Sequence, residues 1–66
     1  MKVTLSGKIT DLPDNISIAR LLVLKNIEPA HTVVELRGEV ILSGQWNSTI
    51  IREGDTLEVL SFVGGG

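Results

Sequence analysis

Cysteine is absent from this sequence, and aromatic residues are nearly so. Without a thiol the chain has no disulfide framework, no cysteine metal site and no cysteine nucleophile. Tyrosine is also missing, so Val, Ile and Leu must fill the interior around Trp46 and Phe62. No apolar run approaches the roughly 20 residues that span a bilayer, and the first residues already alternate like a strand rather than a signal peptide. We therefore expect a cytoplasmic protein without a membrane partner.

The charge is small and unevenly spread. The 66 residues carry a net charge of −2, which does not favour a nucleic-acid partner. Residues 1–27 hold four basic and two acidic side chains, whereas residues 28–66 hold six acidic and two basic ones. We interpret this as ordinary surface solvation, with steering toward a basic partner as the alternative. With 42% hydrophobic residues, we expect a single domain with one core.

Short alternating segments predict a small sheet. Val3 and Leu5 alternate with polar residues, and the turn signal Ser6-Gly7 joins this strand to a second one at residues 8–12. Further strands are predicted at residues 32–36, 39–42 and 56–63, separated by Arg37-Gly38, by a loop that carries Trp46, and by the turn Arg52-Glu53-Gly54-Asp55. The last strand is the most apolar, so we place it in the centre of the sheet.

One helix is predicted between the second and third strands. Ser17 is a good N-cap, and Ile18, Leu21 and Leu22 share one face at helical spacing. Asn26 is a plausible terminator of this helix. A single helix on one face of a mixed four- to five-stranded sheet is a two-layer α+β domain, the ubiquitin-like β-grasp arrangement. We assign residues 1–63 to this domain and residues 64–66 to a flexible reactive tail.

The last strand continues into three glycines. A frayed end or a linker remnant is the plain explanation for Gly64-Gly65-Gly66. Three residues extend at most about 10 Å, however, and glycine has no side chain to obstruct a narrow channel in a partner protein. The α-carboxylate is ionised at pH 7 and is a poor electrophile, so it must be activated by an enzyme that uses ATP. The chain has no phosphate loop, so it is the substrate of such an enzyme.

Several of these segments together resemble the ThiS family of sulfur carriers in thiamine biosynthesis. The resemblance rests on the stretch from Val34 to Val40, on Trp46, on the turn at residues 52–55 and on the ending Phe62-Val63-Gly64-Gly65-Gly66. It implies that a ThiF-like E1-type enzyme, using ATP and magnesium, adenylates Gly66. Sulfur from a sulfurtransferase or cysteine desulfurase system would then give a thiocarboxylate, which the thiazole synthase ThiG would use. The carrier itself would bind no cofactor and would not be an enzyme.

The last strand also predicts a partner-binding surface. Leu57 and Val59 should face the helix, so Glu58, Leu60 and Phe62 should lie on the open side of the sheet. Exposed apolar residues beside the tail predict docking, and the less favoured alternative is that a loop with Trp46 covers them.

Two residues depart from the pattern of the family. Arg37 stands where the family usually has Asn, and we expect it to be exposed and to bear on partner choice more than on the fold. Solvated charge is the expectation for both Arg37 and Arg52. Phe62 is bulkier than the expected small residue, which bears on the identity of the partner enzyme.

Other functions remain open at this point. The small subunit of molybdopterin synthase has the same fold, but it often has proline before its final glycines, where this chain has Ser61-Phe62-Val63. Carriers for tRNA thiolation or cysteine synthesis, a protein conjugation role and a β-grasp interaction module without tail chemistry are further alternatives. An enzyme is the least favoured class, because no nucleophile and acid–base group form a recognisable constellation.

His31 is the single histidine and has no second ligand at metal spacing, so no metal site is predicted.

Overall fold

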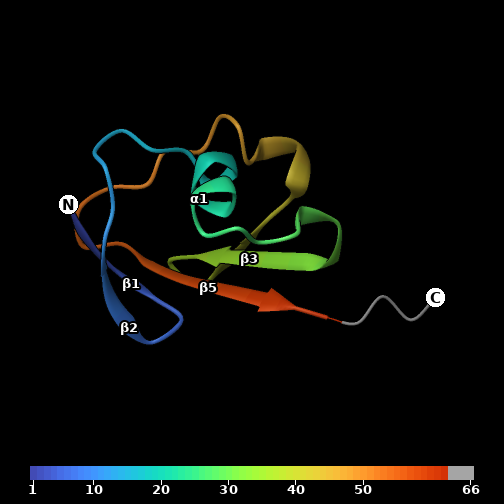
Figure 1. The fold of residues 1–66 in the computed structure, drawn as a ribbon, viewed down its shortest axis with the longest axis horizontal. Coiled ribbons are helices and arrows are strands. Elements are labelled where there is room, and N and C mark those ends of the chain that lie inside the picture. The colour runs from blue at the N-terminus through green and yellow to red at the C-terminus, as the bar shows by residue number, and fades with distance from the viewer. Residues whose placement is uncertain (63–66) are drawn as a thin grey trace.

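The computed structural model describes residues 1–62 and places one α-helix over a five-stranded sheet (Figure 1). The elements in chain order are β1 (Lys2–Leu5), β2 (Lys8–Asp11), α1 (Ile18–Leu24), β3 (Thr32–Leu36), β4 (Glu39–Ile41) and β5 (Thr56–Ser61), with short 3₁₀ turns at Pro29–His31 and Ser43–Gln45. The sheet order is β2-β1-β5-β3-β4. Strands β1 and β5 are parallel and the other pairs are antiparallel. The predicted α+β β-grasp fold, with the last strand in the centre, is confirmed.

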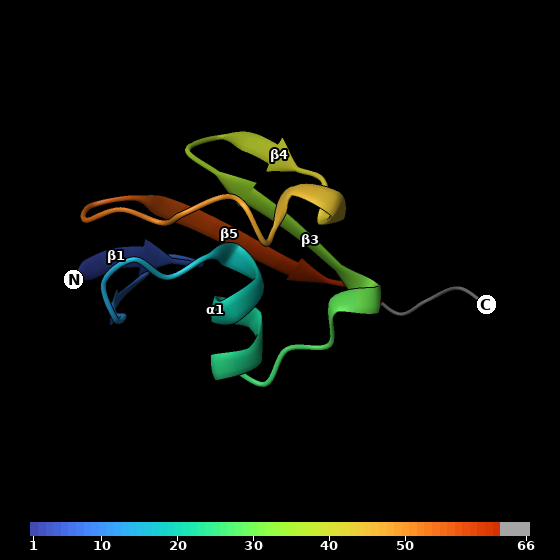
Figure 2. The ribbon, with the colours of Figure 1, turned by 90° about the horizontal axis from the view of Figure 1, so that it is seen from above.

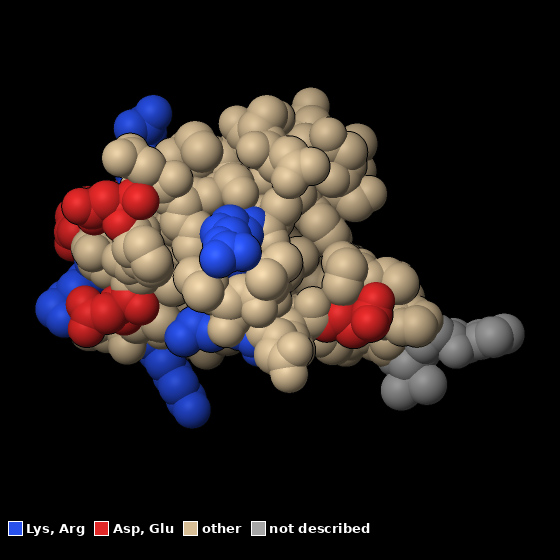
Figure 3. Space-filling view, turned by 45° about the horizontal axis from the view of Figure 1, so that its top comes forward, with Lys and Arg blue, Asp and Glu red and all other residues tan. Residues whose placement is uncertain are grey.

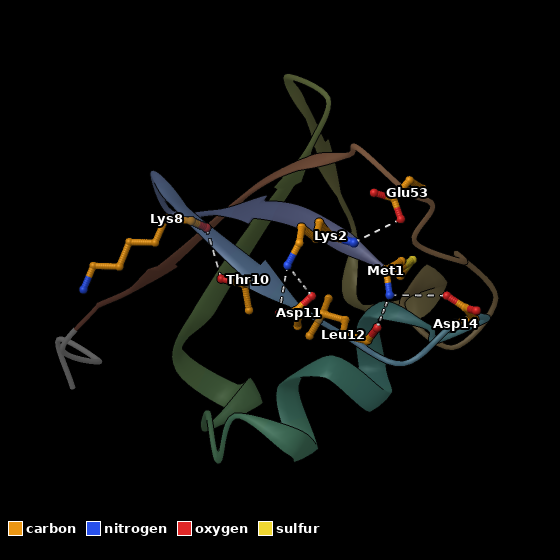
Figure 4. A network of polar contacts seen from close by, with 8 residues as sticks. All are labelled: Met1, Lys2, Lys8, Thr10, Asp11, Leu12, Asp14 and Glu53. Carbon is orange, nitrogen blue, oxygen red and sulfur yellow. Dashed lines mark hydrogen bonds and ion pairs between the residues drawn. The ribbon is translucent and has the colours of Figure 1, made fainter.

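The first hairpin is closed by a tight turn and by polar contacts along its length. Ser6 and Gly7 both have positive φ, at 47° and 82°, as the two central residues of a type I′ turn require. At the other end of the hairpin, Lys2 Nζ lies 2.9 Å from Asp11 Oδ1 (Figure 4). The backbone N–H of Lys2 donates to Glu53 Oε1 at 3.1 Å. These contacts connect β1 to β2 and to the turn before β5.

Helix α1 begins and ends where local chemistry requires. The Ser17 hydroxyl accepts a hydrogen bond from the Arg20 N–H at 3.1 Å, which confirms the predicted N-cap. At the other end, Asn26 has a φ of 58°, and the Ile27 N–H donates to the Leu22 carbonyl at 2.9 Å. This left-handed residue with a hydrogen bond back across the last turn is a Schellman motif. Asn26 therefore ends the helix as predicted.

The core lies between α1 and the sheet. Its buried members from these elements are Val3, Ile18, Leu21, Leu22, Val34, Leu36 and Leu57. Trp46 completes this core from the segment between β4 and β5, and its indole Nε1–H donates to the Ile41 carbonyl at 2.9 Å. That segment runs beside α1 on the same side of the sheet (Figure 2). Among residues 1–62, no element covers the opposite side (Figure 1). Within residues 1–62, no helix is long and apolar enough to cross a membrane.

Some boundaries differ from the prediction. Strands β2 and β4 each end one residue early, at Asp11 and Ile41. Strand β5 ends at Ser61, and Val63, the last residue of the predicted strand, lies outside the described residues. The 3₁₀ turns were not predicted, because runs of three residues leave little periodic pattern in a sequence.

Candidate functional site: the open face of the sheet and the end of β5

Strand β5 is paired on both sides where it begins, and from Glu58 to Ser61 it is paired with β3 alone, apart from the hydrogen bond that the Val59 N–H donates to the Ser6 hydroxyl at 3.3 Å. Leu57 pairs with Leu5 of β1 and with Leu36 of β3. One residue beyond the strand, the Phe62 N–H donates to the His31 carbonyl at 2.9 Å. The rings of these two residues also meet edge to face, with their centroids 5.9 Å apart. The chain is therefore fixed in position as far as Phe62.

The two faces of β5 differ as the alternation predicts. Leu57 is fully buried and Val59 is partly buried against the core. On the other face, Leu60 and Phe62 are 51% and 52% exposed, and Glu58 is half-buried. Because Trp46 belongs to the core, it does not cover Leu60 or Phe62. Their predicted exposure is confirmed; their role in docking stays a prediction.

Neighbouring strands enlarge this surface. Val33 lies directly opposite Leu60, and Val40 lies opposite Glu35 on the far edge of the sheet. Directly opposite residues share a face of a sheet. We call Val33, Val40, Leu60 and Phe62 the open-face patch. Sequence reasoning missed Val33 and Val40, and the alternation within their own strands would have placed them here once the strand order was known.

An acidic pair borders the open-face patch. Glu35 and Glu58 lie directly opposite each other on adjacent strands. Like charges in this position destabilise the sheet. A basic side chain from a partner would relieve that repulsion, which is consistent with the predicted place of Glu58 in an interface.

Arg37 does not behave as a purely solvated charge. Its side chain is 57% exposed, but Nη1 lies 2.8 Å from Oδ1 of the buried Asp55. The other carboxylate oxygen of Asp55 accepts from the Arg52 N–H at 2.8 Å. The expectation that Arg37 is only a solvated surface charge is therefore wrong, because it neutralises a buried carboxylate of the turn before β5. The exposed part of Arg37 stays a predicted contact for a partner.

The described residues offer no metal centre. Among residues 1–62, no three His, Cys, Asp or Glu side chains are grouped so as to hold an ion. The charged side chains on the helix side stand singly or in small groups on an otherwise uncharged surface (Figure 3). The predicted tail residues Gly64, Gly65 and Gly66 lie outside the described residues. The described part of the candidate site therefore consists of the end of β5 and the open-face patch.

This arrangement defines a class of protein: a ubiquitin-like β-grasp domain whose central strand leads to the C-terminal residues and presents an apolar surface beside them. Within that class, the chain belongs to the ThiS family, whose model matches residues 2–66. ThiS proteins are small sulfur carriers rather than catalysts, and they act with enzymes of the thiamine pathway. The predicted family resemblance is thus confirmed.

Two solved structures agree with this assignment. A crystal structure of the thiamine biosynthesis protein ThiS from Geobacter metallireducens is 33% identical, with a TM-score of 0.85 and full coverage of both chains. An NMR solution structure of a thiamine biosynthesis protein from the same organism is also 33% identical, with a TM-score of 0.81, and the match covers 100% of this chain and 88% of that one. The search of curated proteins finds no match.

Proposed function

We propose that this chain carries sulfur as a thiocarboxylate on Gly66 and donates it for thiazole formation in thiamine biosynthesis. An oxygen of the Gly66 carboxylate attacks the α-phosphorus of ATP, and pyrophosphate leaves. The terminal sulfur of a persulfide on the sulfur-donor protein then attacks the acyl carbon of the adenylate, and AMP leaves. A thiol attacks the donor-side sulfur of the resulting acyl disulfide, so that a disulfide forms and the thiocarboxylate is released. Activation is necessary because a carboxylate anion is a poor electrophile.

The observation that carries this proposal is the position of β5 in a chain of the ThiS family. The central strand is paired with β1 where it begins and with β3 as far as Ser61, and the hydrogen bond from Phe62 to His31 continues the β3 side by one residue. The sequence then continues through Val63 into three glycines. An ordered body that the structure describes as far as Phe62, followed in the sequence by Val63 and by three residues without side chains at positions 64–66, suits delivery of the carboxylate into the active sites of other proteins.

The proposed partners follow from this chemistry. A ThiF-like adenylating enzyme supplies the ATP and magnesium site, and a sulfurtransferase or cysteine desulfurase system supplies the sulfur. The thiazole synthase ThiG accepts the sulfur. We propose that these proteins dock on the open-face patch in the cytoplasm, and that the carrier itself holds no cofactor. Exposed apolar patches that are rimmed by polar residues often mark such interfaces.

Intact mass spectrometry tests the proposal. The full chain is incubated with ATP, magnesium, a ThiF-like enzyme and a sulfur source, and the reaction without ATP is the control. Exchange of oxygen for sulfur at an activated carboxyl, the step that follows adenylation, raises the mass by about 16 Da. Fragmentation should place the change on Gly66. An unchanged mass in the presence of active partners would overturn the proposal.

A further inference from the structure

A groove lies on the helix side of β5, away from the open-face patch. Its volume is about 340 Å³, and it is lined by Leu5, Ser6, Lys8, Thr10, Lys25, Ile27, Val59 and Ser61. The first hairpin forms one wall, and the end of α1 with the segment after it forms another. Ser61, the last residue of β5, belongs to the lining. The groove therefore opens beside the point where the chain leaves the sheet.

The lining of this groove is basic and apolar. Lys8 belongs to β2 and Lys25 follows the end of α1, and none of the described residues that line the groove is acidic. Among residues 1–62, neither lysine forms an ion pair. Lys8 extends away from its strand, whereas Lys2 reaches Asp11 (Figure 4). Two unpaired cations on a chain whose net charge is −2 make this groove a local site for anionic groups.

The surface of the lining is mainly apolar. Leu5, Ile27 and Val59 are partly buried and pack against the core, so their outer atoms form an apolar floor. The Ser6 hydroxyl oxygen already accepts from the Val59 N–H at 3.3 Å, which leaves its O–H available as a donor. An acidic residue next to an aliphatic one would find partners for both side chains here.

We propose that this groove receives an acidic segment of the adenylating enzyme, with its carboxylates between Lys8 and Lys25 and an aliphatic side chain on the floor. This inference rests on the proposed function, because it assumes that enzyme as the partner. Both lysines are exposed and the groove is open, which suits an extended peptide better than a small molecule, since small ligands are usually enclosed over most of their surface. A partner that also covers the open-face patch would hold the end of β5 from both sides.

Charge reversal tests this inference. The full chain carrying Lys8→Glu and Lys25→Glu together is titrated into the adenylating enzyme without ATP, and Kd is measured by calorimetry at low and high salt. Arg20→Glu together with Arg52→Glu is the matched control, because it changes the net charge equally and both residues are exposed but do not line the groove. We expect Kd to rise about tenfold for the double lysine variant at low salt, with a weaker salt dependence than in the unmodified chain, and to stay unchanged for the control.

The outcomes separate this inference from the proposed function. If the unmodified chain is not adenylated by the active enzyme, the proposed function fails. If it is adenylated but the double lysine variant binds as the control does, with both chains folded by circular dichroism, only the groove inference fails. Binding of inorganic phosphate or AMP to the free carrier, seen as NMR shifts confined to groove amides, would also overturn it by showing a small-anion site.

Discussion

At the scale of single residues, the turn at residues 52–55, before β5, contributes to stability through its last residue, Asp55. Asp55 is 7% exposed, and both its carboxylate oxygens have partners, the Arg52 N–H and the Arg37 guanidinium. Arg37 has a φ of 52°, in the left-handed region, which costs about 1–2 kcal/mol for most L-residues and less for Asn. Its backbone N–H still donates to the Thr56 carbonyl at 2.9 Å. The ion pair with Asp55 thus offsets backbone strain at Arg37.

Substitution of Asp55 tests how much its carboxylate contributes to the free energy of unfolding. Asp55→Ala leaves the Arg52 N–H and the Arg37 guanidinium without their acceptor, so we expect a loss of about 1–3 kcal/mol in the free energy of unfolding. Asp55→Asn keeps an acceptor oxygen, so its free energy of unfolding should fall by less. Urea denaturation followed by circular dichroism measures both, with Glu39→Ala as an exposed control. Equal stability of the Asp55→Ala variant and this control would contradict the structural role of Asp55.

At the scale of elements, the first hairpin combines a left-handed turn with one exposed ion pair. Lys2 and Asp11 face each other in the strand register, and the side-chain hydrogen bond and charge of Lys2 lower the pKa of Asp11 from its usual value of 3.8. A group whose pKa is lower in the folded chain stabilises the fold above its unfolded pKa. That contribution is lost as the pH falls through the folded pKa. The ion pair therefore makes the hairpin more stable at neutral than at acid pH.

The pH dependence of stability tests this ion pair. Lys2→Met should lower the melting temperature slightly at pH 7, because exposed pairs contribute little. The difference from the unmodified chain should begin to shrink near the usual pKa of 3.8 and should approach zero as the pH falls through the lowered pKa that Asp11 has in the folded chain. Lys8→Met, in the same hairpin, is the control because Lys8 forms no ion pair within residues 1–62. If the difference in melting temperature between Lys2→Met and the unmodified chain stays constant with pH, the ion pair does not stabilise the fold.

At the scale of the whole molecule, one layer of helix divides the sheet into two unequal faces. The helix side holds the core and the groove, and the other side presents the open-face patch. Strand β5 contributes to both, with Val59 on one side and Leu60 on the other. Because β5 is the central strand, a partner that binds either face also binds close to the exit of the tail.

Leu60→Asp tests the open-face patch. Leu60 is 51% exposed, so the variant should fold, and its stability should fall only slightly. A charge in the centre of the patch should weaken binding to the adenylating enzyme, by tenfold or more if Leu60 is buried in the complex. Val23→Asp is the control, because Val23 is 65% exposed on α1, which covers the opposite face. Equal affinity of the two variants by calorimetry would exclude the patch as the docking surface.

Much of this fold could be predicted because its signals are local. The alternation of Val3 and Leu5, the cap at Ser17 and the terminator at Asn26 each act through neighbouring residues, and each is found as predicted. The Arg37–Asp55 pair could not be predicted in this way. Its residues are 18 positions apart and meet only because the β3–β4 turn lies beside the turn before β5. The contact between Val33 and Leu60 in the open-face patch could not be predicted from local signals either, because it joins two strands that are far apart in the sequence.

The order of apolar and polar residues along the chain determined by itself which segments became strands and helix and which face of each was buried. That order follows from the hydrophobic effect and from backbone geometry, which act over a few residues. Only the tertiary structure decided which segments became neighbours: it placed Lys8 and Lys25 in the lining of one groove, Val33 beside Leu60 and Arg37 beside Asp55. Contacts between distant residues depend on how the strands are ordered in the sheet. The alternation of residues within one strand does not indicate which strands lie next to it.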